Sequence, residues 1–315
     1  EDTKLTASGY QAVTTALLAF VQAGDHILVA DSVYQPTRQF CDVMLSRLGV
    51  ETQYYDPRIG GDIAKLLRPN TRLIFAESPG SLTFEVQDIP ALAEAARARD
   101  LWLLVDNTWA SPLYCQPLAL GADVSIQAAT KYIVGHADAL LGSITSNARA
   151  ARYIERASGH LGVCPGSEET FLGLRGLRTL DVRLQRHQQT GIALARWLQT
   201  RSEVERVIHP ALHDHPDHSL WVRDFLGASG LFSIILKPTS RTALAAFLDG
   251  LSYFGMGYSW GGYESLIIPF DCSSYRTATS WTSSGPALRL HAGLEDPQDL
   301  IADLEAGFAR LTAAS

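Results

Sequence analysis

The sequence predicts an α/β protein in which a mostly parallel sheet carries helices on both faces. Short apolar segments alternate with helical segments through the first half of the chain, as in a doubly wound sheet. The segment 101–106, Leu-Trp-Leu-Leu-Val-Asp, is a continuous apolar run typical of a central strand buried on both faces. With 315 residues, 46% of them hydrophobic, the chain can bury a large core and form two domains.

The expected elements of the first half follow from caps, turns and apolar runs. Ser8 is the predicted N-cap of a helix that runs to Phe20. Strands are expected at 26–30, 50–55, 71–76 and 101–106, helices at 62–67 and 91–99, and a segment at 31–38 that leads into a helix. The run 140–145 should return antiparallel after a loop, which would complete the sheet.

The second half indicates a smaller α+β unit. A helical pattern extends from Glu168 to Thr200 and is expected to bridge into it. Strands are predicted at 230–236 and 287–291, with helices at 242–248 and 299–311 covering one side. We therefore expect one domain over 1–177 and a second over 178–315.

Composition excludes several classes of function. The 26 basic and 33 acidic residues give a net charge of −7, and no Lys/Arg-rich run is present, so nucleic acid is not an expected partner. No apolar run approaches the length of a membrane span, and the first residues lack a signal-peptide pattern, so a soluble protein is expected, and the cysteine pattern favours the reducing cytoplasm. Four widely spaced cysteines, at 41, 115, 164 and 272, are expected to be reduced and buried as small hydrophobic residues.

One lysine in an apolar neighbourhood indicates the chemistry. Lys131 follows the apolar run that begins at Asp123 and precedes a glycine-containing loop. Such a lysine can extend its amine to water or form an ion pair, or its amine can be held neutral for Schiff-base chemistry. Asp106 ends the neighbouring strand, so both side chains would face one crevice beyond the strand ends. That layout suits pyridoxal phosphate, whose aldehyde takes a lysine and whose ring nitrogen takes an aspartate.

Longer motifs carry a resemblance through nearly the whole chain. The segments 106–110 (Asp-Asn-Thr-Trp-Ala), 125–131 (Ser-Ile-Gln-Ala-Ala-Thr-Lys) and 135–138 (Gly-His-Ala-Asp) resemble the Cys/Met-metabolism family of fold-type I pyridoxal-phosphate enzymes. The segments 77–81, 259–265 and 288–295 are similar to its bacterial cystathionine β-lyase branch. The resemblance implies a large, mostly parallel seven-stranded sheet domain and a smaller α+β C-terminal domain.

The resemblance also implies roles for individual residues. Lys131 would form the Schiff base, Asp106 would hold the ring nitrogen protonated, and Tyr34 would stack on the ring and assist proton transfer. The amides of Gly9 and Tyr10 and the hydroxyl of Thr130 would bind the phosphate. Arg289 would bind the substrate carboxylate, assisted by Ser259 and Trp260. From the residues alone, Arg289 needs a carboxylate partner, and a structural salt bridge is the alternative.

The implied reaction is β-elimination of L-cystathionine to homocysteine, pyruvate and ammonia, a step of methionine biosynthesis. The loop 79–81 reads Pro-Gly-Ser where many relatives have Ser-Asn-Pro, which argues against the γ-lyase and γ-synthase branches. The alternatives are a cystine or cysteine-S-conjugate β-lyase, a γ-lyase or sulfhydrylase of the same fold, and a non-catalytic scaffold.

Two further expectations concern partners and metals. Family members carry several tens of residues before the point where this sequence starts, and a Tyr-x-Arg pair from that region grips the phosphate in the adjacent subunit. No matching pair occurs here, so we expect a homo-oligomer, a dimer or tetramer with shared active sites, and leave cofactor occupancy open. The histidine-rich segment 209–218 is expected to be a polar connection, because two prolines prevent a helical alignment of ligands, and no metal is expected.

Overall fold

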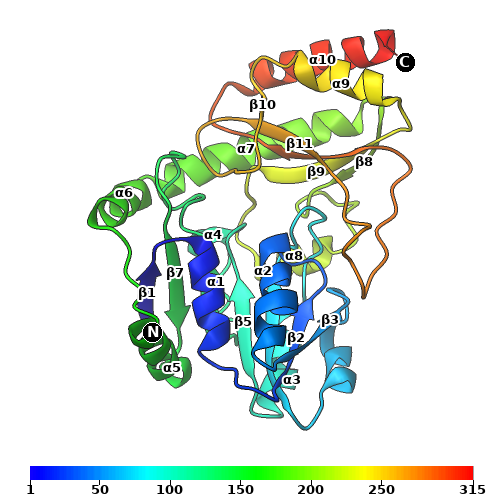
Figure 1. The fold of residues 1–315 in the computed structure, drawn as a ribbon. Helices are drawn as coiled ribbons and strands as arrows, with labels where there is room; N and C mark the ends of the chain where they lie inside the picture. Colours follow the sequence, from blue (N-terminus) through cyan, green and yellow to red (C-terminus); the bar gives the residue numbers. More distant parts are fainter. Residues whose placement is uncertain (315) are drawn as a thin grey trace.

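The computed structural model describes residues 1–314 as two sheets with helices packed on each (Figure 1). The larger sheet has seven strands in the order β1-β7-β6-β5-β4-β2-β3, and β7 is the only strand of this described sheet that runs antiparallel to the others. Its strands are β1 Asp2–Thr6, β2 His26–Ala30, β3 Glu51–Tyr55, β4 Thr71–Glu77, β5 Trp102–Asp106, β6 Val124–Gln127 and β7 Gly142–Ser146. The α/β fold class predicted from the sequence is confirmed.

The helices of this half include α1 Gly9–Leu18, α2 Gln35–Gln39, α3 Ile89–Arg97, α4 Ser111–Tyr114 and α5 Ala148–His160. A π-helical turn, Phe40–Leu45, continues α2, and a 3-10 helix spans Gly60–Leu66. Helix α1 packs on β6 and β7, whereas α3 packs on β4 and β5. Strands such as β2 and β5 are buried at every position, which is why they appear in the sequence as unbroken apolar runs.

The second sheet has five strands in the order β10-β11-β12-β9-β8, and α7, α9 and α10 share one apolar core with it. The strands are β8 Val204–Ile208, β9 Leu231–Leu236, β10 Gly255–Met256, β11 Leu266–Phe270 and β12 Ala287–His291. The helices are α6 Ser167–Leu177, α7 Leu180–Gln199, α8 His218–Asp224, α9 Arg241–Asp249 and α10 Pro297–Ala313. In Figure 1, α9 and α10 lie side by side at the end farthest from the large sheet.

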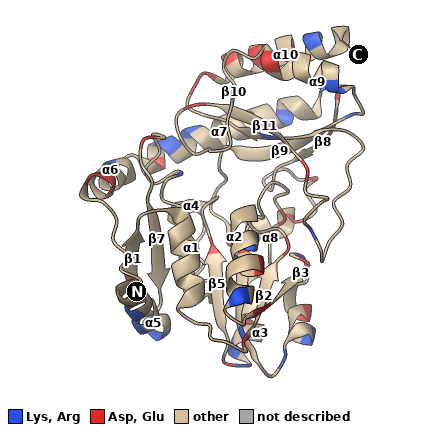
Figure 2. Ribbon diagram, in the orientation of Figure 1, with Lys and Arg blue, Asp and Glu red and all other residues tan. Residues whose placement is uncertain are grey.

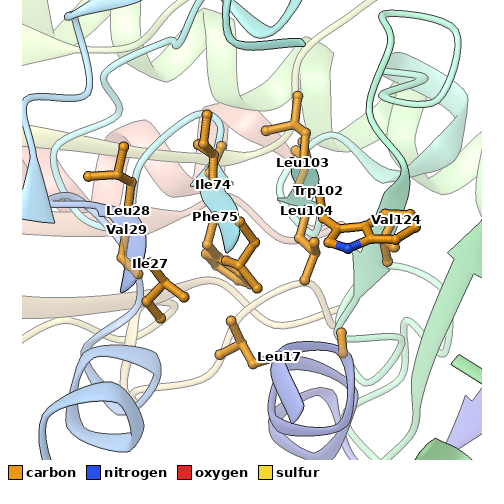
Figure 3. Packing of buried hydrophobic residues seen from close by; sticks show 14 of the residues in the cluster. Leu17, Ile27, Leu28, Val29, Ile74, Phe75, Trp102, Leu103, Leu104 and Val124 are labelled. Atoms are coloured by element: carbon orange, nitrogen blue, oxygen red, sulfur yellow. The ribbon is translucent and has the colours of Figure 1, made fainter. Parts of the chain in front are cut away.

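The core of the large sheet is built from branched and aromatic side chains of its central strands. Figure 3 labels Val29 of β2, Phe75 of β4 and Leu104 of β5, which are paired in register and so share one face of the sheet, with Leu17 of α1 packed against that face. All four side chains have no exposed surface. Burial of each such side chain contributes about 1.5–3 kcal/mol. Close packing of this layer fixes the positions of the strands, and with them the carboxyl ends of β4 and β5.

The start of α1 shows why two small residues are needed there. The Ser8 side chain accepts a hydrogen bond from the amide of Gln11, so the predicted N-cap is confirmed. A Cβ on Gly9 would lie 2.3 Å from the Cβ of Ala128, a distance no real contact reaches. Because Gly9 has no side chain, the first turn of α1 can pack directly against Ala128, three residues before Lys131.

Several expectations about elements need correction. The helical pattern 168–200 is two helices, α6 and α7, separated at Arg178 and Thr179, because the chain turns between the two halves. The helix expected at 62–67 is a 3-10 helix. No strand was predicted before Ser8, yet β1 pairs antiparallel with β7 and extends the sheet. The strand predicted at 287–291 is β12, which is buried at all five positions because both of its faces are covered. The domain boundary near residue 177 stays a prediction.

Charged residues of both signs occur in both halves of the molecule, and three of the four cysteines are buried. Figure 2 shows blue and red segments in both halves of the molecule; in α10 the acidic residues lie toward the start of the helix and an arginine lies near its end. Cys41, Cys115 and Cys272 are buried free thiols, whereas Cys164 is exposed, so its predicted burial was wrong. Cys164 lies in the irregular stretch between α5 and α6, where no sheet covers it. No helix within residues 1–314 combines the length and the apolar character needed to cross a bilayer.

A buried carboxylate ties the two halves together beside β2. Asp31 has no exposed surface and forms an ion pair with Arg38. It also accepts backbone hydrogen bonds from Thr277 (3.0 Å), Ala278 (3.2 Å) and Thr279 (2.8 Å), which lie between β11 and β12. Desolvation alone would raise the pKa of Asp31, but these hydrogen bonds outweigh it, so the pKa lies below its ordinary value.

We predict that Asp31→Asn destabilises the protein by about 3 kcal/mol at pH 7, because it leaves Arg38 without its buried counter-ion. A carboxyl with a lowered folded pKa contributes stability above its unfolded pKa and loses it as pH falls through the folded value. The difference between wild type and variant should therefore shrink below about pH 4. Urea unfolding from pH 3 to 7 measures it, with Asp249→Asn, at an exposed position, as the control. A difference that is constant with pH would contradict the assignment.

Candidate active site

A cavity of about 240 Å³ lies beyond the carboxyl ends of β4 and β5. The end residues Glu77 and Asp106 are paired in register on these parallel strands, so both carboxylates reach the same edge of the sheet. The start of α1, the Lys131 loop and the segment before β11 complete the walls. Of the residues predicted from the sequence, the cavity is lined by Gly9, Tyr10, Tyr34, Asp106, Thr130, Lys131, Trp260 and Arg289. Ser259 is not part of this lining, but it contacts Lys131 directly.

Lys131 is a largely desolvated amine without a counter-ion. Its Nζ donates to Ser259 Oγ at 2.9 Å and lies 5.2 Å from the centre of the Trp260 ring. Within residues 1–314, no carboxylate pairs with it, so the ion-pair explanation for this lysine does not apply. Desolvation, followed by the positive charge of Arg289, lowers the pKa of Lys131 to about 8. A neutral, nucleophilic amine is therefore accessible near physiological pH.

Asp106 presents one free oxygen to the cavity. Its Oδ1 accepts hydrogen bonds from the Thr108 amide at 3.0 Å and the Thr108 hydroxyl at 2.6 Å. Oδ2 accepts no hydrogen bond from any residue the structure describes. Desolvation raises the pKa of Asp106, and the Thr108 hydrogen bonds partly offset that rise. A cationic N–H donor in the cavity would supply the missing partner of Oδ2 and favour the ionised carboxylate.

Glu77 was quoted in the sequence motif but not expected in the site. Its Oε2 accepts the backbone amide of Tyr34 at 2.7 Å, which fixes the loop that carries the Tyr34 ring. Desolvation, followed by the charge of Asp106, raises the pKa of Glu77 well above its ordinary value. The available signal was its position: Glu77 ends β4 as Asp106 ends β5, so the two acids had to share an edge.

Tyr34 stands at the mouth of the cavity with half of its surface exposed. Desolvation and then the charge of Glu77 raise the pKa of its phenol. A half-exposed ring above a desolvated cavity provides a flat surface against which an aromatic ligand can stack. Its expected role in stacking and proton transfer stays a prediction.

The opposite end of the cavity suits an anion. Helix geometry leaves the amides of Gly9 and Tyr10 without intrahelical partners, while the Gln11 amide is taken by Ser8. The Thr130 hydroxyl donates to the Leu141 carbonyl at 3.1 Å and accepts from the Leu141 amide at 2.9 Å. Its expected contact with a phosphate would require this donor to reorient, and that contact stays a prediction.

Arg289 is a buried cation with no carboxylate partner within residues 1–314, so the alternative of a structural salt bridge does not apply. One of its nitrogens, Nη2, donates to the carbonyls of Gly257 (3.3 Å), Tyr258 (2.8 Å) and Ser259 (3.2 Å). Desolvation lowers the pKa of Arg289 to about 10. Three carbonyls orient the guanidinium but do not neutralise it, which leaves a desolvated positive charge for an anionic ligand.

The histidine-rich segment forms backbone turns. His209 Nδ1 accepts the Ala211 amide and His215 Nδ1 accepts the Asp217 amide, both at 3.1 Å. His218 Nδ1 is 3.0 Å from the Pro210 carbonyl. Over the described part of the chain, no group of three or more His, Cys, Asp or Glu side chains is arranged to hold a metal ion.

The residues that line the cavity fit both the pyridine ring and the phosphate of pyridoxal phosphate. The lowered pKa of Lys131 suits bond formation with an aldehyde, and the free Oδ2 of Asp106 suits a ring N–H. The unpaired amides at the start of α1 suit a phosphate. The fold and the site thus define an enzyme built to use this cofactor.

The comparisons with known proteins specify the family. Residues 1–309 match the family model described as Cys/Met metabolism PLP-dependent enzyme, and the chain belongs to this family. It is 47% identical over 309 residues to cystathionine beta-lyase of Escherichia coli, covering 96% of this chain and 78% of that protein. It is 42% identical over 306 residues to an L-alanine/L-glutamate racemase of Wolbachia pipientis, covering 96% and 75%. The cystathionine gamma synthase structure of Xanthomonas oryzae aligns with a TM-score of 0.92 at 32% identity, covering 99% and 82%.

We predict that Lys131 in the cofactor-free protein reacts with an amine reagent with a pH midpoint of about 8. Arg289→Gln should move this midpoint upward, because it removes the second cause of the lowered pKa. Mass spectrometry of the modified peptide from pH 6 to 11 measures it, and the exposed Lys65 serves as the internal control. Equal midpoints for Lys131 and Lys65 would contradict the desolvated environment described above.

Proposed function

We propose that the protein catalyses β-elimination of L-cystathionine, a carbon–sulfur lyase reaction that gives homocysteine, pyruvate and ammonia. The observation that carries the proposal is one cavity that holds a low-pKa amine, an aspartate with a free oxygen and a buried arginine without a counter-ion. The identity to the Escherichia coli cystathionine beta-lyase supports this substrate. The loop 79–81, Pro-Gly-Ser, supports β- over γ-elimination.

Bound pyridoxal phosphate supplies an electron sink for the pair released when a proton leaves the substrate Cα. Lys131, Asp106 and Thr130 would hold it, together with the amides of Gly9 and Tyr10. Asp106 keeps its negative charge against the cofactor ring nitrogen, so that the nitrogen stays protonated. Thr108 holds that carboxylate in place through Oδ1.

The other residues act on the substrate. Arg289 binds the α-carboxylate and so sets the orientation of the Cα–H bond. The neutral Nζ of Lys131 takes the Cα proton, and the Ser259 hydroxyl at 2.9 Å holds that amine in position. The C–S bond at Cβ then breaks with both electrons going to sulfur, and the thiolate leaves as homocysteine after taking a proton. Water releases the remaining three-carbon fragment as pyruvate and ammonia.

We also propose a homo-oligomer in the cytoplasm. Large apolar side chains are exposed along α6 and the start of α7, namely Phe171 (64% exposed), Leu174 (52%), Leu177 (49%) and Val182 (63%). A second copy of the chain would cover such a face, and Leu140 at the cavity rim is 62% exposed near it. The four free thiols support a reducing compartment.

The first test is the wild-type protein and Lys131→Ala, each given cofactor and L-cystathionine. Wild type should show the visible absorption of bound cofactor and release thiol and pyruvate in equal amounts. Lys131→Ala should lose the absorption and the turnover together, because the bond-forming amine is gone. Release of 2-oxobutyrate with cysteine would indicate a γ-lyase, and conversion of L- to D-amino acid without thiol would indicate a racemase. Retention of absorption and turnover by the variant would overturn the proposal.

Asp106→Asn should keep bound cofactor but reduce kcat by about 10²- to 10³-fold, because a neutral amide cannot hold the ring nitrogen protonated. Steady-state assays with L-cystathionine measure this loss. The matched control is Asp303→Asn, an equally buried aspartate that does not line the cavity and accepts the amides of Ser252 and Tyr253. It should lower stability while leaving kcat close to wild type. Equal losses in both variants would argue against the assigned role of Asp106.

A further inference from the structure

The turn from Tyr258 to Gly261 contacts both cations of the site, yet it is itself part of no helix or strand. Ser259 accepts from Lys131, and the carbonyls of Tyr258 and Ser259 accept from Arg289. Gly261 has φ +85°, and a Cβ there would lie 2.9–3.0 Å from the backbone and Cβ of Lys131. A small movement of this turn would therefore change the surroundings of Lys131 and Arg289 together.

One imidazole holds this turn at two points. His291 Nε2 accepts the amide of Gly261 at 3.0 Å, and Nδ1 is 3.0 Å from the carbonyl of Glu264. A carbonyl can only accept, so Nδ1 carries the proton, and Nε2 must be unprotonated to receive the amide. The ring is thus neutral in a single tautomer. Its surroundings favour this state, since His291 has no exposed surface and the cationic groups Lys131 and Arg289 lie nearby.

The position of His291 on β12 links it to substrate binding. It lies two residues after Arg289, so both side chains point to the same face of the strand. The guanidinium and the imidazole therefore contact one turn from one strand. Among the ionisable groups around the ring, His187, Arg289 and Lys131 all disfavour protonation of His291.

We propose that His291 is a positioning residue that holds the turn from Tyr258 to Gly261 against Lys131. The Ser259 hydroxyl then stays within reach of Lys131, and the carbonyls of Tyr258 and Ser259 stay within reach of Arg289. It acts through Gly261 and Ser259 and touches neither substrate nor cofactor. The proposal rests on the function proposed above and adds a residue that holds the site through its hydrogen bond to Gly261.

The chain contains a matched control for this histidine. His187 on α7 also has no exposed surface, and its ring centre lies 5.2 Å from that of His291. Its Nδ1 bonds the Ala292 carbonyl at 2.8 Å, but its Nε2 has no partner and it holds no part of the turn. Replacing His187 disturbs the same core without removing a hydrogen bond to the turn.

Two conservative substitutions separate the two nitrogens of His291. The amide nitrogen of Asn corresponds in position to Nδ1 and keeps a donor for Glu264, whereas the oxygen of Gln corresponds to Nε2 and keeps an acceptor for Gly261. We expect His291→Asn to lower kcat/KM for L-cystathionine by about 10- to 100-fold, because it removes the acceptor for the Gly261 amide that orients active-site groups. We expect His291→Gln and His187→Asn to stay within about threefold of wild type.

The decisive readout is amide hydrogen exchange of the 257–263 peptide in each full-length, cofactor-loaded protein. In His291→Asn this peptide should exchange about tenfold faster, while core peptides of the large sheet stay unchanged. Should this variant fail to fold, His291→Ser, which removes the acceptor with a smaller side chain, takes its place.

Unchanged exchange of the turn, or equal effects of the His187 and His291 substitutions, would overturn the proposal. Exchange requires no turnover, so the holding of the turn is tested even if L-cystathionine proves not to be the substrate. Failure of the proposed function would then appear in the product assay alone.

Discussion

The site depends on holding two partly desolvated cations without giving either a counter-ion. Lys131 and Arg289 both lose hydration, and each carries a pKa below its ordinary value. Desolvation of this kind costs free energy unless a ligand supplies the missing negative charge. The chain holds the two groups with a hydroxyl, an aromatic face and carbonyl oxygens, all of them neutral. The cavity is thus prepared for a ligand that brings its own carboxylate.

Holding these groups requires both sheets. Lys131, Asp106 and Glu77 come from the edge of the large sheet, whereas Arg289 and the turn it contacts belong to the smaller one. Contacts that cross between the halves include the Asp31 hydrogen bonds and the bond from Trp109 Nε1 to the Leu231 carbonyl at 2.9 Å. Ser233 also donates to the Leu82 carbonyl at 2.8 Å, next to the cavity wall. The relative position of the halves therefore sets the spacing between cofactor and substrate groups.

The same arrangement explains why relatives of this family differ in their reactions. An amine that can remove a Cα proton serves a β-lyase, a γ-synthase and a racemase equally. The reaction is then decided by what lies on the far side of the substrate and where the proton returns. In this chain the loop 79–82, Tyr258 and Trp260 line the cavity beside the cofactor and substrate groups. The shared machinery thus defines the family, and the walls of the cavity select the product.

The sequence by itself determined the alternation of strands and helices, the cap at Ser8, and the placement of Lys131 and Asp106 at strand ends. These features depend on local patterns: apolar runs, capping residues and the rule that parallel strands end at one edge. Only the tertiary structure decided that Glu77 holds the Tyr34 loop, that Arg289 has carbonyls instead of a carboxylate, and that His291 reaches Gly261. The break between α6 and α7 and the pairing of β1 with β7 were likewise beyond local patterns. Each depends on contacts between residues far apart in the chain, whose existence is set by how the two halves pack and not by the residues near them in sequence.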